Sequence, residues 1–118
     1  MTESKSLTQK KCQSCEGIGK PLEHQEIKKM LAHTPQWQVT AEGKGIKREY
    51  ETKNFSVAID FINKVAQIAE DENHHPDIHL TGYRNVRIEL TTHALGGLSE
   101  NDFIVAAKIG ELGVELKD

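Results

Sequence analysis

The sequence has little of several features that define specialised classes of protein. Its 118 residues include two cysteines and 5% aromatic residues, and its longest apolar run covers only residues 103–107. Two cysteines cannot support a disulfide-rich scaffold, and this run is far shorter than the roughly 20 residues of a membrane-spanning helix. Residues 1–11 contain no apolar segment of the kind found in a secretory signal. We therefore expect a cytoplasmic protein that makes no contact with a membrane.

An excess of basic charge is also missing. The chain contains 15 Lys and Arg against 18 Asp and Glu, which gives a net charge of -3. Nucleic-acid-binding domains usually carry a basic surplus, so we expect no direct contact with nucleic acid. Hydrophobic residues make up 36% and charged residues 28% of the chain, a composition typical of a single globular domain.

Residues 1–20 show no hydrophobic periodicity, and we expect them to form a flexible N-terminal tail ahead of one domain over residues 21–118. The tail holds Cys12 and Cys15 at CxxC spacing. Such a pair can be half of a zinc site or a redox pair. Because no second CxxC is present and no strand precedes the motif, we interpret it as a plain surface pair.

Hydrophobic periodicity predicts three helices and four strands. The helices are expected over residues 22–32, 55–70 and 99–116, and the strands over 37–39, 46–52, the segment after Pro76, and 86–93. This order is α-β-β-α-β-β-α. Two pairs of adjacent strands favour an α+β fold with two layers, in which a four-stranded antiparallel sheet carries three helices on one face.

Two features do not fit a simple two-layer pattern. Arg48 interrupts the side of strand 46–52 that otherwise carries Ile46 and Tyr50. The last helix shows two apolar stripes, which is more than packing on one sheet requires. The second stripe predicts a subunit interface, and hence a homo-oligomer.

Histidine placement is the strongest chemical signal. Four of the six histidines lie between positions 74 and 93, and acidic residues surround the first of them. They are His74, His75, His79 and His93. An imidazole can give or take a proton near neutral pH, so this cluster suits general acid/base chemistry. Solvated histidines in a polar loop are the plain alternative, and the residues alone leave the choice open.

A metal site is the competing functional interpretation. His74, His75, Asp77, His79 and His93 are all possible ligands. The spacing from His75 to His79 places alternate residues on one face of an extended strand. Pro76 interrupts that strand, and the spacing fits no closed zinc site, so we favour acid/base chemistry.

Several motifs, in order, resemble the pterin-4a-carbinolamine dehydratase family. They are Glu70-x-x-x-His74-His75-Pro76, the aromatic Tyr83, Thr91-Thr92-His93 and Gly97-Leu98-Ser99-Glu100-x-Asp102, within a resemblance over about residues 20–116. The resemblance implies a hydro-lyase that removes water from a 4a-hydroxytetrahydropterin to give quinonoid dihydropterin. It implies recycling of the tetrahydropterin used by aromatic amino-acid hydroxylases, with the pterin as substrate and no cofactor or metal. It also implies a dimer or tetramer.

The same resemblance implies roles for individual residues. His74 and His93 match the acid/base histidines, without deciding which is the acid. His75 matches a residue that binds and orients the pterin and contributes to catalysis, and Asp102 matches a site aspartate that could hold an imidazole in one tautomer. The implied substrate-binding positions are Glu70, Asn73, His74, His75, Thr91, Thr92, His93 and Ala94.

The sequence departs from the family pattern in places. Animal members carry Asp at the position of Asn73 and Trp at that of Ile78, which bears on the shape of the pocket. Two alternatives to the dehydratase remain open at this point. One is a molybdopterin-related accessory role, and the other is a regulatory role in which the oligomer surface binds another protein.

Overall fold

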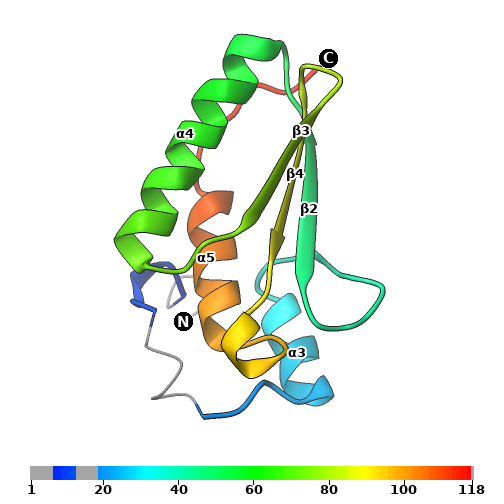
Figure 1. Ribbon diagram of the computed structural model, residues 1–118, viewed down its shortest axis with the longest axis vertical. Helices are drawn as coiled ribbons and strands as arrows, with labels where there is room; N and C mark the ends of the chain where they lie inside the picture. Colours follow the sequence, from blue (N-terminus) through cyan, green and yellow to red (C-terminus); the bar gives the residue numbers. More distant parts are fainter. Residues whose placement is uncertain (1–6, 13–18, 118) are drawn as a thin grey trace.

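Figure 1 shows the computed structural model of the protein, which describes residues 7–12 and 19–117. The elements are α3 (His24–Leu31), β1 (Gln38–Val39), β2 (Ile46–Glu51), α4 (Phe55–Glu72), β3 (Asp77–Thr81), β4 (Asn85–Leu90), the 3-10 helix η1 (His93–Leu95) and α5 (Glu100–Gly110). The α+β class and the predicted order of helices and strands are confirmed. The turn η1 and a short helical stretch at residues 7–9 are additions.

The four strands form one antiparallel sheet in the order β1-β2-β4-β3. The register places Tyr50 opposite Val86 and Ile78 opposite Ile88. Because side chains alternate along a strand, this register collects the apolar residues on one face. Helices α4 and α5 lie over that face, and α3 packs beside α5 (Figure 1). The opposite face of the sheet carries mostly charged and polar side chains.

The last helix is shorter than the sequence predicts. It ends at Gly110 rather than near Leu116, and Leu116 instead forms a β-bridge with Thr52. Gly110 and Gly113 explain this end, since glycine costs about 1 kcal/mol relative to alanine inside a helix. The buried apolar residues of α5 are at most 1% exposed within the single chain: Phe103, Ile104, Val105, Ala106 and Ile109. The members of the second stripe that lie in α5, Val105 and Ile109, are therefore covered by the chain itself, while Leu112 and Leu116 lie beyond the helix.

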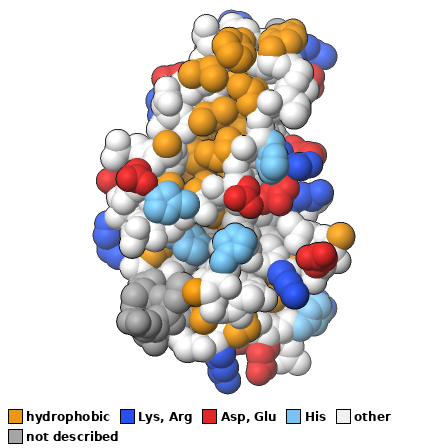
Figure 2. Space-filling view, in the orientation of Figure 1, with side chains coloured by type: hydrophobic (Ala, Val, Ile, Leu, Met, Phe, Trp, Pro, Cys, Tyr) orange, Lys and Arg blue, Asp and Glu red, His pale blue; other side chains and the backbone are white. Residues whose placement is uncertain are grey.

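Another apolar surface is left open instead. Phe55 and Ile59 on α4 are 52% and 38% exposed, and Ile62, Ile78 and Leu80 are half-buried. Figure 2 shows hydrophobic side chains in a band along α4 and beside β3. We call these five residues the α4–β3 strip. No helix in the described part of the chain is long and apolar enough to cross a membrane.

Part of the segment expected to be a tail packs onto the domain. Leu7 is 2% exposed and belongs to the core cluster, and the Cys12 backbone N–H donates to Glu72 Oε1 at 2.9 Å. The Cys12 thiol lies 3.6 Å from the Asn101 carbonyl oxygen. Burial, reinforced by the charge of Glu72, raises the pKa of Cys12 to about 12, so the thiol stays protonated. Cys15 lies outside the described residues.

Glu72, at the end of α4, holds this segment in place. It is 6% exposed and pairs with Lys108 of α5 and with Lys11. Burial alone would raise the pKa of Glu72. The hydrogen bonds from Lys108 and from Cys12, together with the charges of Lys108 and Lys11, outweigh that effect and lower the pKa to about 2. The carboxylate therefore joins α4, α5 and residues 10–12.

Replacing Lys108 tests this ion pair. Lys108→Met leaves the buried carboxylate without its main partner, and we expect the free energy of unfolding to fall by roughly 1–3 kcal/mol near neutral pH. Because the folded-state pKa of Glu72 is lowered, its contribution is present above about pH 4.5 and is lost as the pH falls towards about 2. Urea unfolding at a series of pH values should show the two proteins converging in acid.

The control is Lys53→Met, which removes an exposed pair with Glu115 whose side chains are 60% and 70% exposed. We expect this change to cost less than about 1 kcal/mol. An equal loss in both variants, or a Lys108→Met deficit that is independent of pH, would contradict the structural role of Glu72.

Candidate functional site

His74 is positioned by the end of α4. Asn73, the residue after the helix, adopts the left-handed conformation with φ 53°, a position that asparagine tolerates better than most residues. The His74 backbone N–H then donates to the Ala69 carbonyl at 3.1 Å and closes the turn. This turn directs His74 inwards, and only 9% of it is exposed.

Asp102 is the partner of His74. Its Oδ1 lies 2.7 Å from His74 Nε2, and its Oδ2 accepts hydrogen bonds from Thr92 Oγ1 at 2.8 Å and from the Ser99 backbone N–H at 2.9 Å. The Asp102 side chain is fully buried, in the first turn of α5. A buried carboxylate requires this number of donors, and the start of a helix is favourable for a negative charge. Ser99 and Asp102 form a capping box at the start of α5, and its acid also holds His74.

The hydrogen-bond directions around Asp102 follow from the number of protons available. Thr92 has one hydroxyl proton and donates it to Asp102, so in the 2.7 Å contact between Thr92 and Ser99 the Ser99 hydroxyl must be the donor. The ionised carboxylate can only accept, so His74 carries a proton on Nε2. In a neutral His74 the free nitrogen is then Nδ1.

His75 points elsewhere. Its Nε2 lies 2.6 Å from Glu70 Oε2, one turn back on α4, and both side chains are more than half exposed. The pair stands beside the buried His74–Asp102 pair but makes no contact with it among the described interactions. In Figure 2, histidine side chains gather between the end of α4 and η1, with acidic side chains next to them.

His93 lies on the wall of a cavity of about 450 Å³. Thr91, Leu90 and Gly96 line it from the same part of the chain, Asp77 and Glu89 from the sheet, and residues 40–45 from the β1–β2 turn. The Thr91 hydroxyl donates to the Lys44 carbonyl and joins the turn to this wall. Ala94 is exposed in η1. His74 and His75 do not line this cavity. Asp77, which does line it, follows the turn that contains His74 and His75 by two residues.

The predicted site residues therefore fall into three linked groups. His74, Asp102 and Thr92 form a buried network, His75 and Glu70 form an exposed pair, and His93 and Thr91 face the cavity. The Thr92 side chain is 2% exposed and is hydrogen-bonded to Ser99 and Asp102, so it positions Asp102 rather than offering a group to a ligand. Ser99 entered the sequence analysis only as part of the Gly97–Asp102 motif, and its contact with Thr92 depends on the turn between them.

The competing metal interpretation receives no support from the geometry. In the part of the chain that the structure describes, no three His, Cys, Asp or Glu side chains are grouped so that they could hold a metal ion. His79 lies on the outer face of the sheet, 3.9 Å from Glu89, and the Nε2 of His74 is occupied by Asp102.

Comparisons with known proteins agree with the motifs. The family model described as pterin 4 alpha carbinolamine dehydratase matches residues 20–112. A relative from Methylococcus capsulatus, named as a putative pterin-4-alpha-carbinolamine dehydratase, is 44% identical over 93% of this chain and 96% of its own length. The mitochondrial pterin-4-alpha-carbinolamine dehydratase 2 of Arabidopsis thaliana is 45% identical over 92% of this chain and 60% of its own.

A solved structure is also similar. It is a protein from Brucella melitensis described as a transcriptional coactivator/pterin dehydratase, with a TM-score of 0.72 and 31% sequence identity. The match covers 76% of this chain and 95% of that one.

Thr92→Val tests the positioning of Asp102. The change removes one of three donors to the carboxylate, so we expect His74 to spend less time in the Nε2–H tautomer. Nitrogen-15 spectra of the His74 ring measure this directly. Thr52→Val is the matched control, since its hydroxyl is equally buried and shares its one proton between the Asn54 and Arg84 carbonyls. We expect both variants to lose about 1–2 kcal/mol of stability. An unchanged His74 tautomer in Thr92→Val would contradict the positioning role.

Proposed function

The chain belongs to the pterin 4 alpha carbinolamine dehydratase family and is a hydro-lyase, and from this premise we propose that it removes water from a 4a-hydroxytetrahydropterin by histidine acid/base catalysis. The product is a quinonoid dihydropterin. The observation that carries the proposal is the buried His74–Asp102 pair, which is linked through Thr92 to the segment that bears His93.

His74 is the general base in this proposal. Elimination requires that a ring nitrogen of the substrate lose a proton. His74 presents Nδ1 as its proton acceptor because Asp102 occupies Nε2. When His74 takes up the proton, the carboxylate stabilises the imidazolium that forms. No rearrangement of the buried network is needed during this step.

His93 is the general acid. The other half of the elimination is protonation of the departing hydroxyl group, which then leaves as water. His93 is exposed on the cavity wall, so it can exchange protons with solvent between turnovers. The base, His74, is thus fixed by its hydrogen bond to Asp102, and the acid, His93, regains its proton from water.

The cavity provides the binding surface for the pterin. Its volume of about 450 Å³ lies within the range typical of small-molecule sites, roughly 300–1,000 Å³. The edge of a pterin presents hydrogen-bond donors and acceptors in a row, which backbone groups of residues 91–94 can match. His74, His75 and Asn73 lie beyond the edge of the cavity that Asp77 forms, so in this proposal the substrate extends from the cavity towards them, with His75 oriented by Glu70. We propose that this reaction uses no cofactor or metal.

The place of the reaction in metabolism follows from its chemistry. A carbinolamine at carbon 4a is what aromatic amino-acid hydroxylases leave on their tetrahydropterin, so we propose that this protein recycles that cofactor in the cytoplasm. A reductase would then act on the quinonoid product.

A second proposal concerns assembly. The α4–β3 strip leaves Phe55 and Ile59 open on one face, and exposed apolar patches of this kind usually mark interfaces. We propose that the strip joins copies of this chain in a homo-oligomer. The Brucella melitensis relative is described as a transcriptional coactivator as well as a dehydratase. The same strip is therefore the surface on which a regulatory partner would compete with self-association.

Histidine variants test the catalytic proposal. A hydroxylase generates the carbinolamine in place, and absorbance follows its decay to quinonoid dihydropterin. We expect His74→Ala and His93→Ala each to lower kcat by roughly 10²-fold or more, the usual range for one acid/base group. His24→Ala, an exposed histidine at the start of α3, is the control and should be unchanged.

The pH profiles separate the two roles. His74→Ala should lose the limb of the pH–rate curve that reports the base, and His93→Ala the limb that reports the acid. Identical profiles in the two variants would contradict the assignment. Full activity in both would exclude His74 and His93 as the acid/base pair.

Ile59→Glu tests the assembly proposal. A charge in the centre of the α4–β3 strip opposes burial of that face, so we expect the particle mass from light scattering to fall towards that of one chain. Ser56→Glu adds the same charge on the solvent side of α4 and should leave the mass unchanged. A wild-type protein that is monomeric at every concentration would refute the proposal.

A further inference from the structure

Arg48 is a charged residue on the helix-facing side of β2 that the dehydratase site does not use. Its guanidinium group lies over the Tyr50 ring, 4.3 Å from the centroid, which fixes its orientation. No described carboxylate forms an ion pair with it. Burial raises the pKa of Tyr50 to about 12, against the opposing charge of Arg48, so the ring beneath stays neutral and does not compensate the cation.

Trp37 is a second unpaired donor beside Arg48. It is 4% exposed, yet its indole N–H has no hydrogen-bond partner among the described residues. Three described side-chain atoms are sealed from solvent and have no hydrogen-bond partner: Thr34 Oγ1, Tyr50 Oη and Arg87 Nε. The indole nitrogen of Trp37 is not among them. A buried indole normally directs its N–H at an acceptor. Because this nitrogen is not sealed, its N–H is open to an acceptor from outside the chain, either water or a ligand.

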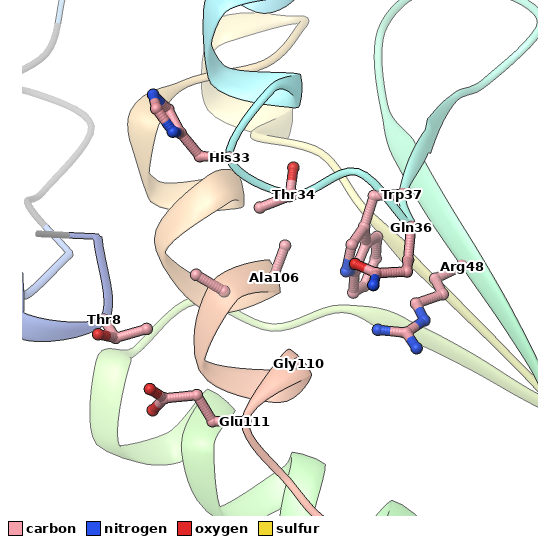
Figure 3. Close-up of a pocket in the computed structure, with 10 residues that line it drawn as sticks. Thr8, His33, Thr34, Gln36, Trp37, Arg48, Ala106, Gly110 and Glu111 are labelled. Carbon is pink, nitrogen blue, oxygen red and sulfur yellow. The ribbon is translucent and has the colours of Figure 1, made fainter. Parts of the chain in front are cut away.

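These two residues line a pocket of about 340 Å³ at the end of α5. His33 also lines this pocket, whereas His74, His75 and His93 do not. Ala106, Ala107 and Gly110 form its floor, and none of them has a side chain large enough to fill it. In Figure 3, Trp37, Gln36 and Arg48 stand together on one side of the end of α5, and Thr8 and Glu111 lie on the other. We call this the α5 pocket.

The walls of the α5 pocket differ in chemistry. One side offers the guanidinium N–H groups of Arg48, the indole N–H of Trp37 and the amide of Gln36. The partial negative charge at the C-terminus of α5 attracts Arg48 and accounts for its position. This diffuse partial charge leaves the N–H groups of the planar guanidinium without specific acceptors. Those groups match the two oxygens of one carboxylate. The floor is apolar.

We propose that the α5 pocket binds a small aliphatic carboxylate, with its two oxygens on Arg48 and Trp37 and its hydrocarbon part over Ala106, Ala107 and Gly110. The ligand is either a simple carboxylic acid or an amino acid, whose ammonium group would face Glu111. The site is separate from the dehydratase centre, so its occupation does not depend on the proposed reaction.

The chain contains one tryptophan, so the fluorescence and the indole N–H resonance of Trp37 report on this pocket alone. We would titrate the full-length protein with 4-methylpentanoate, leucine and the neutral 4-methylpentanamide, which have closely matched carbon skeletons. We expect a saturable shift of the indole N–H signal with the carboxylates and none with the amide. If Glu111→Gln weakens the binding of leucine more than the binding of 4-methylpentanoate, the ligand class is an amino acid. If Glu111→Gln changes the affinity for leucine and for 4-methylpentanoate equally, the ligand class is a simple carboxylic acid.

Arg48→Met should weaken binding of 4-methylpentanoate by roughly tenfold or more, the usual effect of losing a charged hydrogen-bond partner. Arg84→Met is the matched control, because Arg84 also lies over a tyrosine ring, 5.3 Å from the Tyr83 centroid, but outside the pocket. His93→Ala should leave the affinity unchanged. Ala107→Leu, which fills the floor without touching a charge, should also abolish the shift. Equal responses to acid and amide, or no saturable response, would overturn the proposal.

Discussion

The hydrogen bond between Asp102 and His74 is the interaction on which the site depends. A fully buried carboxylate is costly unless its oxygens are satisfied, and here three donors converge on it. One donor is the Ser99 backbone N–H at the start of α5, one is Thr92 two residues beyond β4, and one is His74 two residues beyond α4. A single side chain therefore fixes the relative position of three elements and the proton on His74.

This arrangement separates rigid from accessible groups. His74 is almost enclosed and has one nitrogen committed to the protein, whereas His93 is exposed on a cavity wall. Two imidazoles of the same intrinsic chemistry thereby acquire different environments, and different environments are what allow one residue type to serve in two proton-transfer roles. The left-handed Asn73 is the local backbone feature that makes the difference, because it turns His74 inwards.

Local signals in the sequence were sufficient for much of the fold. The helices expected to begin at residues 55 and 99 and the strand expected over 86–93 each depend on residues a few positions apart, and all three are present. The end of α5 was missed because Leu112 and Leu116 continue its apolar spacing. Apolar spacing alone does not establish a helix: Leu112 is half-buried, and Leu116, which forms a β-bridge with Thr52, is 48% exposed.

The site itself was predicted as a set of residues but not as a network. The resemblance could name His74 and Asp102, whereas the relay through Ser99 and Thr92 depends on the turn that brings them together. Arg48 was visible in the sequence as a break in a pattern, but only the structure shows that no carboxylate among the described residues pairs with it.

The docking of Cys12 on Glu72 has a consequence for local stability. The hydrogen bond joins residues 60 positions apart, and Glu72 is the last residue of α4, two positions before His74. Residues 7–12 and the final turn of α4 should therefore open as one cooperative unit in hydrogen exchange. The histidine turn is thus restrained by a segment that contributes no group to the chemistry. A shortened chain that lacked this segment could keep every residue of the site and still hold His74 less firmly.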